Sequence, residues 1–407
     1  MRVEEGAFSS RLLGGRAAAG VRARLQGVLR WIRALDYVLE PVLNRELGRL
    51  DPEVRATLRL GLHEMMFMDC PPQLATDGAV HLIRRLGKSS ASGMVNAVLR
   101  KAAGSWRDRL AGAAIDVRLA HPEWLWRRWQ ASFGAAVAEQ SMAAAQEPAT
   151  TWVWFLDEEA KKALAADGIE ITPHPWCPGT FSSPDDPGLL VREVGRGSAY
   201  AQDPSSQLVA HVAAALTDAG RALDLCAAPG GKSALMLKLR AWERVAAADV
   251  NLGRARLMQP LLERLNATAV VAADVERTPF VAGGWDLVLL DAPCTGTGTF
   301  RRHPELKWRL APEKIHEMAA KQRHLLASGL ELVAPGGILL YATCSVEPEE
   351  NEEVVADLPS RFERADLVAA LPQGIPWIPT AAGGVRILPN PDGDGFSMHA
   401  VRRRASA

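Results

Sequence analysis

Two stretches of nine residues decide the fold, and each ends at or next to one of the five cysteines of the chain. Residues 286–294 read Asp-Leu-Val-Leu-Leu-Asp-Ala-Pro-Cys, and residues 337–345 read Gly-Ile-Leu-Leu-Tyr-Ala-Thr-Cys-Ser. A short apolar run bounded by turn residues is typical of a buried strand in a parallel sheet. Ligands bind beyond the carboxyl ends of such strands, so Cys294, Cys344 and the Asp291 carboxylate are predicted to face a ligand. Two thiols at neighbouring strand ends indicate covalent chemistry.

The composition of the chain is that of an ordinary globular protein. At 407 residues, with 48% hydrophobic and 23% charged residues, it is long enough for two or three domains. It contains no apolar run of about 18 residues, and residues 1–5 lack the pattern of a secretory signal, so we expect no membrane partner. Five cysteines without close Cys/His pairs predict neither a disulfide framework nor a metal site. We therefore expect a cytoplasmic protein.

Charge is unevenly distributed, although the formal net charge of the whole chain is zero. Residues 1–130 carry 21 Lys and Arg against 13 Asp and Glu, a net charge of +8, and the remainder carries 26 basic and 34 acidic residues, a net charge of −8. A basic front half is typical of a protein that binds a polyanion. A solvated helical surface would give the same excess, so charge alone leaves both interpretations open.

Residues 16–130 are predicted to be helical, because their apolar residues recur at three- and four-residue spacing. The Asp-Pro pair at 51–52 is typical of an N-cap and first turn. The Cys-Pro-Pro triplet at 70–72 ends the helix that follows, and two more helices are expected at about 73–87 and 90–103.

From Tyr200 onward, short apolar runs alternate with helical patterns, which is the mark of a parallel sheet. The preceding residues 150–196 mix short apolar runs with Pro and Gly and predict a small α/β subdomain. The expected strands are 222–225, 244–249, 268–272, 285–290 and 338–341. The first expected helix opens at 202–206 and runs to 216. The later expected helices are 233–239, 252–265, 312–332 and a short one from 348.

A glycine-rich turn follows the first of these strands and opens a helix. Residues 226–232 read Cys-Ala-Ala-Pro-Gly-Gly-Lys. Glycine lets the backbone approach a ligand closely, and the N-terminus of a helix favours an anionic group. The spacing matches neither the dinucleotide fingerprint nor the Walker loop, so a nucleotide phosphate is not favoured. The methionine carboxylate of S-adenosylmethionine would suit the same amides.

Three aspartates stand at the ends of successive predicted strands. Asp249 ends the second strand, 18 residues after Gly231, where a carboxylate holds ribose hydroxyls in dinucleotide folds. Asp274 follows the third strand and could reach an adenine amino group, and Asp291 ends the fourth. One such aspartate is more often a cap, but three in register after a glycine-rich turn favour a cofactor. The candidate cofactor-binding residues are Cys226, Ala227, Ala228, Pro229, Gly230, Gly231, Lys232, Asp249, Asp274 and Asp291.

Two charged segments near the cysteines allow more than one interpretation. A basic cluster within residues 301–309 follows Cys294, and contact with phosphate is favoured over a merely solvated loop. The acidic run 347–353 is interpreted as the acidic bias of a helix N-terminus rather than as part of catalysis.

Five blocks, in this order along the chain, resemble the bacterial 16S ribosomal RNA cytosine-5 methyltransferases of the RsmB/Sun (Fmu) type. The first two blocks are similar to the NusB-like helical domain that opens those proteins, and the last three to their methyltransferase domain. The blocks are Leu-Arg-Leu-Gly-Leu-His-Glu-Met at 58–65, Gly-Met-Val-Asn-Ala-Val-Leu-Arg at 93–100, the turn at 226–232, Asp-Ala-Pro-Cys at 291–294 with Arg302, Pro304, Glu305 and Trp308, and Thr-Cys-Ser at 343–345 with Glu349, Glu350, Asn351 and Glu352.

The resemblance implies an α/β Rossmann-like class I methyltransferase domain with a mostly parallel sheet, preceded by an all-α NusB-like domain. The family carries one or two further helices before the segment that matches 27–30, so we expect a helical domain that is short at its N-terminus. The family often has Gly-Phe-Phe where this chain has Gly-Phe-Ser at 395–397, and we expect slight repacking there. The implied domains are 1–120 for the NusB-like RNA-binding domain, 121–199 for a connecting linker and small α/β subdomain, and 200–407 for the methyltransferase domain.

The activity implied is methyl transfer from S-adenosylmethionine to carbon 5 of a cytosine in small-subunit ribosomal RNA. Carbon 5 is a poor nucleophile, but a thiolate that adds at carbon 6 turns the ring into an enamine that attacks a methyl sulfonium. In the similar family the Thr-Cys-Ser cysteine attacks and the Pro-Cys cysteine aids release, which makes Cys344 the nucleophile and Cys294 the release cysteine. Cytosine methyltransferases that act on DNA use a Pro-Cys nucleophile, so an exchange of the two roles stays open. The target base must lie in a loop or be flipped from its stack.

Other functions stay open at this point. A transfer RNA substrate, a non-catalytic RNA-binding assembly factor and a small-molecule methyltransferase are the alternatives, although the paired thiols disfavour the last two. Lys232 could neutralise a carboxylate or polarise the base, and the sequence does not decide between these roles. We expect a monomer whose partner is ribosomal RNA.

Overall fold

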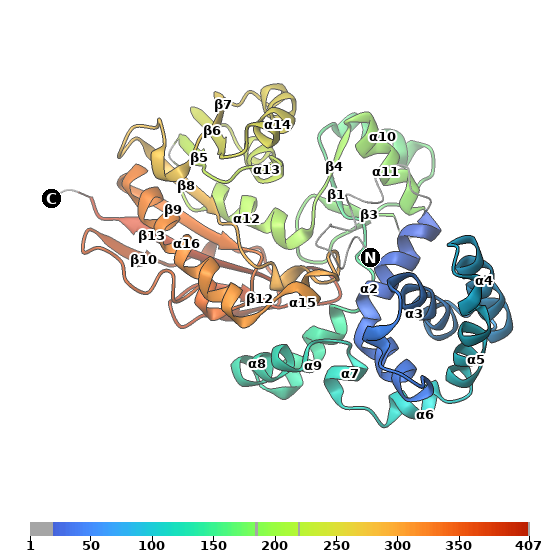
Figure 1. Ribbon diagram of the computed structural model, residues 1–407. Coiled ribbons are helices and arrows are strands. Elements are labelled where there is room, and N and C mark those ends of the chain that lie inside the picture. The colour runs from blue at the N-terminus through green and yellow to red at the C-terminus, as the bar shows by residue number, and fades with distance from the viewer. Residues whose placement is uncertain (1–18, 184–185, 219, 406–407) are drawn as a thin grey trace. The chain divides into compact units, whose positions relative to one another are not determined.

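The structure is a computed structural model, and its helices and strands are labelled in Figure 1. The described residues are 19–183, 186–218 and 220–405. Two sequence predictions fall on residues 1–18 and lie outside the described residues: the lack of a secretory pattern and the short start of the helical domain.

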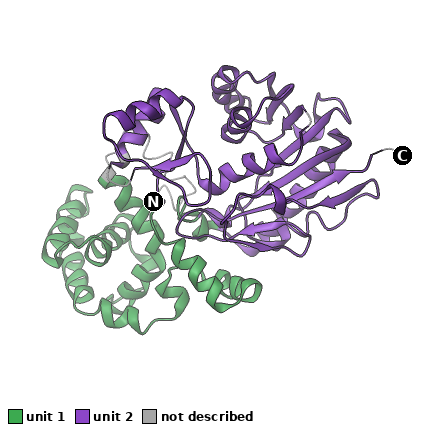
Figure 2. Cartoon of the chain, turned by 180° about the vertical axis from the view of Figure 1, so that it is seen from behind, with its two compact units in different colours: residues 1–148, 300–309 green, residues 149–299, 310–407 purple. Residues whose placement is uncertain are grey.

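The chain folds into two compact units, which Figure 2 shows in different colours. Unit 1 comprises Met1–Pro148 and Phe300–Arg309, and unit 2 comprises Ala149–Thr299 and Leu310–Ala407. The ten residues of the second segment of unit 1 therefore belong with the front of the chain, although they lie close after Cys294 in sequence. The three-part division expected from the sequence stays a prediction.

Unit 1 is helical throughout its described secondary structure. Its helices are α2 (Ala19–Leu39), α3 (Pro52–Phe67), α4 (Pro72–Arg85), α5 (Ser92–Ala103), α6 (Trp106–Ala111), α7 (Ile115–Arg118), α8 (Glu123–Phe133), α9 (Ala135–Ala144) and α15 (Leu306–Arg309), with 3-10 turns η1 (Glu40–Val42), η2 (Leu47–Arg49) and η3 (Ser89–Ala91). Leu35 of α2, Leu62 of α3 and Leu99 of α5 are fully buried in one apolar core, as their helical spacing predicts. Across the described ranges, every helix falls short of the length and apolarity needed to cross a bilayer.

The start of α3 shows how a tertiary contact can override a local signal. Asp51 stands at the N-cap position before Pro52, as the sequence predicts. Its carboxylate does not cap the helix amides and instead accepts a hydrogen bond from Lys88 at 2.7 Å. The predicted boundary is therefore confirmed, but the side-chain cap is wrong, because a lysine after α4 takes the carboxylate.

The segment Phe300–Arg309 is bound into unit 1 by buried contacts. The ring of Phe300 is fully buried and stacks on Trp129 of α8, with ring centroids 6.2 Å apart. Arg30 of α2 donates a hydrogen bond to the carbonyl of Arg301 at 2.7 Å. A stacked ring and a charge-assisted hydrogen bond fasten the first residues of the segment.

Lys307 fastens the other end of this segment. Its side chain is fully buried, and its ammonium nitrogen donates to the amide oxygen of Gln146 at 3.0 Å. Burial lowers the pKa of Lys307 well below its ordinary value, because desolvation disfavours the charged form. The predicted phosphate contact is therefore wrong for Lys307, since a buried amine held by an amide oxygen does not face RNA.

The larger part of unit 2 is a sheet of nine strands. The strands are β5 (Arg221–Asp224), β6 (Arg244–Asp249), β7 (Ala269–Ala272), β8 (Trp285–Asp291), β9 (Val333–Thr343), β10 (Phe362–Ala365), β11 (Trp377–Pro379), β12 (Val385–Ile387) and β13 (Phe396–Arg403). They are ordered β11-β12-β13-β9-β8-β5-β6-β7, and β10 pairs with β13. Strands β5 to β9 pair in parallel, and β10 to β13 pair antiparallel, so the predicted mostly parallel sheet is confirmed.

Helices cover both faces of this sheet. They are α12 (Pro204–Ala215), α13 (Gly231–Leu239), α14 (Leu252–Arg264) and α16 (Pro312–Leu332), with 3-10 turns η4 (Val275–Arg277), η5 (Thr297–Thr299), η6 (Pro348–Glu350) and η7 (Val368–Ala370). The first three helices share one apolar cluster with the sheet, and α16 shares the other. Along β5, Ala222 belongs to the first cluster and Leu223 to the second, because successive side chains of a strand point to opposite faces.

A smaller sheet forms the front of unit 2. Its strands are β1 (Val153–Phe155), β2 (Thr172–Pro173), β3 (Thr180–Ser182) and β4 (Ala199–Ala201), accompanied by α10 (Glu158–Ala166) and α11 (Pro187–Arg196). The order is β2-β3-β1-β4, and all pairs are antiparallel. Fully buried Val153 and Leu190 pack in a core of their own, which gives the small α/β subdomain expected from the sequence.

Replacing Phe300 by alanine should loosen unit 1. Truncation of a buried aromatic side chain costs about 3–5 kcal/mol of stability, so we expect faster amide hydrogen exchange in α8, measured by mass spectrometry. The control is Leu257→Ala in α14, whose side chain is 80% exposed and whose truncation should leave exchange in α8 unchanged. Equal exchange in the wild type and in Phe300→Ala would contradict the docking of this segment.

Candidate active site

Cys294 and Cys344 lie side by side beyond the ends of two neighbouring strands. Strands β8 and β9 are parallel, and Asp291 is opposite Ala342 in their register. Cys344 directly follows β9, and Cys294 follows β8 by three residues. The two sulfur atoms are 3.3 Å apart, and both side chains are partly exposed. The structure thus brings both predicted catalytic cysteines together at the carboxyl edge of the sheet.

The surroundings of Cys294 favour its protonated form. The hydrogen bond to Cys344 is the largest of the causes that raise the pKa of Cys294 well above its ordinary value. Burial and the negative charges of Glu350 and Asp291 act in the same direction. Cys294 therefore keeps its proton and can donate it to the sulfur of Cys344.

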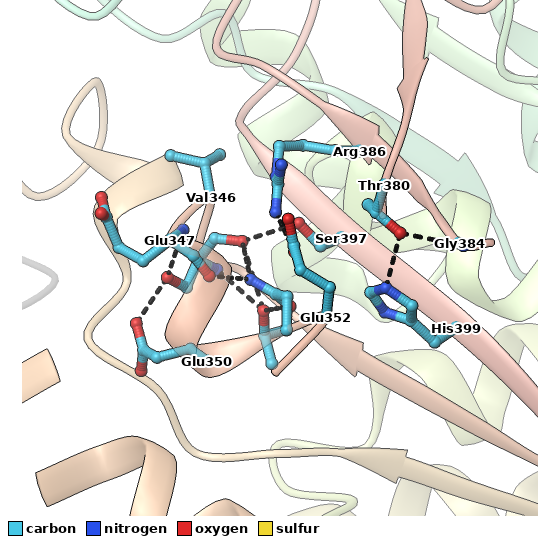
Figure 3. A network of polar contacts seen from close by, with 12 residues as sticks. Val346, Glu347, Glu350, Glu352, Thr380, Gly384, Arg386, Ser397 and His399 are labelled. Atoms are coloured by element: carbon cyan, nitrogen blue, oxygen red, sulfur yellow. Dashed lines mark hydrogen bonds and ion pairs between the residues drawn. The ribbon is translucent and has the colours of Figure 1, made fainter. Parts of the chain in front are cut away.

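Buried side chains form hydrogen bonds to the backbone of the loop that follows Cys344, and Figure 3 shows this network of polar contacts. The side-chain nitrogen Nδ2 of Asn351 donates to the backbone carbonyls of Ser345 at 3.1 Å and of Glu347 at 2.8 Å. The hydroxyl of Ser397 on β13 donates to the same Ser345 carbonyl at 3.0 Å. Ser397 stands where the family pattern has phenylalanine, so the departure adds a hydrogen bond to this loop.

The acidic run 347–353 does not open a helix. Its first residues form the single turn η6, and Glu350 is fully buried. The carboxylate of Glu350 accepts hydrogen bonds from the Thr295 amide at 2.8 Å and from the Ser345 hydroxyl at 2.5 Å. The interpretation as helix-terminal bias is therefore wrong for Glu350, whose side chain points inward between the two cysteine loops. The position of Glu350 within a family-like block was the signal that could have identified it.

The loop that carries Cys294 makes close backbone contacts with its neighbours. The Gly298 amide donates to the Cys344 carbonyl at 3.0 Å, and the Gly395 amide donates to the Gly298 carbonyl at 2.8 Å. A Cβ atom on Gly298 would lie 2.2 Å from the carbonyl oxygen of Gly395. Only glycine fits at such a close approach, so Gly298 lets the loop lie against Gly395, the residue before β13.

The glycine-rich turn joins β5 to α13 in a tight bend. Its Ala227 amide donates to the Ala248 carbonyl at 2.8 Å, which anchors the turn to the neighbouring strand. Gly230 has φ = 99°, and a Cβ atom there would lie 2.8 Å from the Cβ atom of Met258. The helix begins at Gly231, and its first amides have no partner within the helix. The turn therefore presents a helix N-terminus at the carboxyl edge of the sheet.

Asp224 is a further candidate site residue, which the sequence did not suggest. It ends β5, one residue before the glycine-rich turn, and is buried. One carboxylate oxygen accepts a hydrogen bond from Ser233 at 2.6 Å, and the other, Oδ1, is buried without a hydrogen-bond partner. Burial raises the pKa of Asp224 to about 7. Its place at a strand end before a glycine-rich turn is the signal that could have identified it.

The predicted carboxylates differ in what they bind. Asp291 accepts a hydrogen bond from the Lys232 ammonium at 2.6 Å, so in this structure Lys232 neutralises a carboxylate. Asp249 is buried and forms an ion pair with Arg254 of α14. Asp274 lies two residues beyond β7, is exposed, and caps η4 by accepting from the Glu276 amide at 3.1 Å. Of these three contacts, only the one between Asp291 and Lys232 joins two predicted site residues.

These residues fit S-adenosylmethionine by their chemistry. The unpartnered oxygen of Asp224 would suit the ammonium group of a methionine moiety, and the amides at Gly231 would suit its carboxylate. Val250, directly after Asp249, is 69% exposed and offers an apolar surface for a purine ring. The Asp249 carboxylate is of the kind that accepts hydrogen bonds from ribose hydroxyls at this place in dinucleotide folds.

The parallel sheet, the glycine-rich turn after β5 and the acidic strand ends define a Rossmann-like methyltransferase that uses S-adenosylmethionine. Residues 212–402 match the family model of the 16S rRNA methyltransferase RsmB/F, and residues 3–104 match the NusB family. The chain belongs to the RsmB/F family of 16S rRNA methyltransferases. It is therefore an enzyme, an S-adenosylmethionine-dependent RNA methyltransferase.

Curated relatives match almost the whole chain. The protein named Ribosomal RNA small subunit methyltransferase B of Erwinia tasmaniensis is 30% identical over 97% of this chain and 94% of its own length. The protein of the same name from Sodalis glossinidius is 34% identical over 92% of this chain and 88% of its own. A crystal structure of a methyltransferase homologue from Pyrococcus horikoshii covers 71% of this chain and 97% of its own, with 26% identity and a TM-score of 0.57.

Asp224→Asn should make the stability of the protein less dependent on pH. The folded pKa of about 7 lies above the ordinary 3.8, so the wild type loses stability as pH rises from about 4 through 7. Relative to the wild type, the asparagine variant should gain roughly 2.5 kcal/mol of unfolding free energy between pH 5 and pH 8. Urea denaturation at both pH values measures the unfolding free energies of the two proteins. If the variant and the wild type differ by the same amount at pH 5 and pH 8, the assignment of a buried, weakly acidic carboxyl to Asp224 is contradicted.

Proposed function

We propose that the chain methylates carbon 5 of a cytosine in 16S ribosomal RNA through a covalent bond between the Cys344 sulfur and carbon 6 of the base. The observation that carries this proposal is the 3.3 Å contact between the sulfurs of Cys294 and Cys344 at adjacent strand ends. The relatives named as ribosomal RNA small subunit methyltransferases support the choice of RNA. The net charge of +8 in residues 1–130 supports attraction to a polyanion.

Cys344 is the proposed nucleophile. Addition of its thiolate at carbon 6 makes carbon 5 electron-rich, as covalent catalysis on a pyrimidine requires. The neighbouring Cys294 is the thiol that keeps its proton, because its pKa is raised chiefly by the hydrogen bond to Cys344. In this proposal the Cys294 thiol donates the hydrogen bond between the two sulfurs and the Cys344 sulfur accepts it.

Cys294 is the proposed release cysteine. Once the sulfur of Cys344 is bonded to carbon 6, it no longer accepts the hydrogen bond that holds the proton on Cys294. Cys294 can then lose this proton to solvent and, as a thiolate, take the proton at carbon 5. The electron pair of that C–H bond forms the double bond between carbons 5 and 6 and expels the Cys344 sulfur as a thiolate. The contact between the two sulfurs keeps Cys294 beside the bond that must break.

S-adenosylmethionine, when bound, supplies the electrophilic methyl group. The residues proposed to hold it are Cys226, Ala227, Ala228, Pro229, Gly230, Gly231, Lys232, Asp249, Asp274 and Asp291, together with Asp224. In this assignment Asp249 accepts from ribose hydroxyls and Asp274 from the adenine amino group. Asp291, neutralised by Lys232 at 2.6 Å, accepts from the amino edge of the cytosine.

Cys344→Ala should lower turnover by roughly a thousandfold or more, because the nucleophile is lost. Binding of S-adenosylmethionine, measured by calorimetry, should stay close to that of the wild type. The assay follows transfer of a labelled methyl group to unmodified 16S ribosomal RNA, with Cys70→Ala in unit 1 as a matched cysteine control. Retained turnover in Cys344→Ala would mean that the nucleophile lies elsewhere, and transfer to transfer RNA alone would overturn the proposed substrate.

Cys294→Ala should trap the enzyme on its substrate. Without the release cysteine, the bond between Cys344 and carbon 6 persists, so a protein–RNA adduct should accumulate on a denaturing gel. The double variant Cys294→Ala/Cys344→Ala should form no adduct, which is the control. A Cys294→Ala protein that turns over without an adduct would exclude a role of Cys294 in release.

A further inference from the structure

Glu350 connects the two loops that carry the cysteines. Thr295 is the residue after Cys294, and Ser345 is the residue after Cys344. One carboxylate oxygen of Glu350 accepts from the Thr295 amide at 2.8 Å, and the other accepts from the Ser345 hydroxyl at 2.5 Å and from the Thr295 hydroxyl. A single side chain thus bonds to the residues that directly follow both thiols.

The position of Glu350 is itself fixed from two sides. The Tyr341 hydroxyl at the end of β9 donates to the carbonyl of Glu350 at 2.6 Å. Gln322 of α16 donates to the Glu350 carboxylate at 3.1 Å and to the Pro293 carbonyl at 2.9 Å. Because Pro293 directly precedes Cys294, the same helix steadies both the carboxylate and the thiol loop.

Burial of this carboxylate would be unfavourable without hydrogen-bond donors around it. A buried charge is tolerated when hydrogen bonds satisfy it, and the donors of Thr295, Ser345 and Gln322 do so here. Even so, burial raises the pKa of Glu350 above its ordinary value, because desolvation disfavours the charged form. A carboxylate with four acceptor sites can bridge donors from two loops, which an apolar side chain cannot do.

We propose that Glu350 is a positioning residue of the methyl transfer, whose carboxylate holds the loops of Cys294 and Cys344 so that the two sulfurs stay in contact. The catalytic consequence rests on the proposed roles of the two cysteines. The structural part of the proposal, that Glu350 holds the two loops together, does not depend on those roles, because it follows from the hydrogen bonds alone.

The first test measures the proximity of the thiols without RNA. Protein equilibrated with reduced and oxidised glutathione forms an internal disulfide, as two protein thiols and one oxidised glutathione give one protein disulfide and two reduced glutathiones. The equilibrium ratio, read by intact mass and peptide mapping, gives the effective concentration of one thiol at the other. We expect Glu350→Ala to lower this effective concentration by about tenfold or more, and Glu350→Gln, which keeps an acceptor for the Thr295 amide, to restore most of it.

The second test measures the catalytic consequence. Glu350→Ala should lower kcat by about a hundredfold, the typical cost of a small displacement of a catalytic group, while the KM for RNA stays close to that of the wild type. Glu350→Gln should again recover part of kcat. Glu353→Gln is the matched control: its side chain is 54% exposed, and Arg323 approaches it only at 3.9 Å, so both readouts should stay unchanged.

The outcomes separate the proposals. Unchanged effective concentration in a folded Glu350→Ala protein would overturn the positioning role, whatever happens to turnover. A fall in effective concentration with an unchanged kcat would overturn its catalytic consequence, whereas activity retained by Cys344→Ala would overturn the proposed mechanism and leave the loop readout intact. Should Glu350→Ala fail to fold, Ser345→Ala with Thr295→Val removes two of the donors, and an effective concentration equal to that of the wild type would then overturn the proposal.

Discussion

The parallel pairing of β8 with β9 is the constraint on which the site depends. Its register sets Asp291 opposite Ala342, so the chain leaves the two strands at the same edge of the sheet. The loops that follow then bring two sulfurs to 3.3 Å from positions 50 residues apart in sequence. The buried strands give this geometry its rigidity, because Leu289 and Leu340 lie in the apolar cluster that the helices on one face complete.

Polar contacts fix the loops that follow the two strands. The backbone at Gly298 and the side chains of Asn351, Ser397 and Glu350 hold the two thiol loops to each other and to β13. Such a network is most valuable when every member is satisfied, because an unpaired buried group is costly in a low dielectric. The contact between the two sulfurs that fixes their distance is also the largest cause of the raised pKa of Cys294.

Much of the fold could be predicted from local patterns. Strand β6 and helix α16 begin and end where the sequence predicts, because their apolar periodicity and flanking turn residues are strong. The roles of buried polar residues could not be predicted in this way. Glu350 belongs to an acidic run that looks like a helix terminus, and Lys307 belongs to a basic run that looks like a phosphate site, yet both are fully buried. Each has a partner far away in sequence, Gln146 for Lys307 and Thr295 for Glu350, so the tertiary fold decides what these side chains do.

The central claim is that Cys344 forms a bond to carbon 6 of the target cytosine while Cys294 stands beside it. Ribosomal RNA whose cytosines carry fluorine in place of the hydrogen at carbon 5 tests this claim most directly, because a methylated base that cannot lose a proton from carbon 5 stays bonded to the enzyme. With the wild-type protein and S-adenosylmethionine, digestion and mass spectrometry of the cross-linked product should identify a peptide joined to the base through Cys344. A base joined through Cys294, or no covalent product from an enzyme that is active on ordinary RNA, would contradict it.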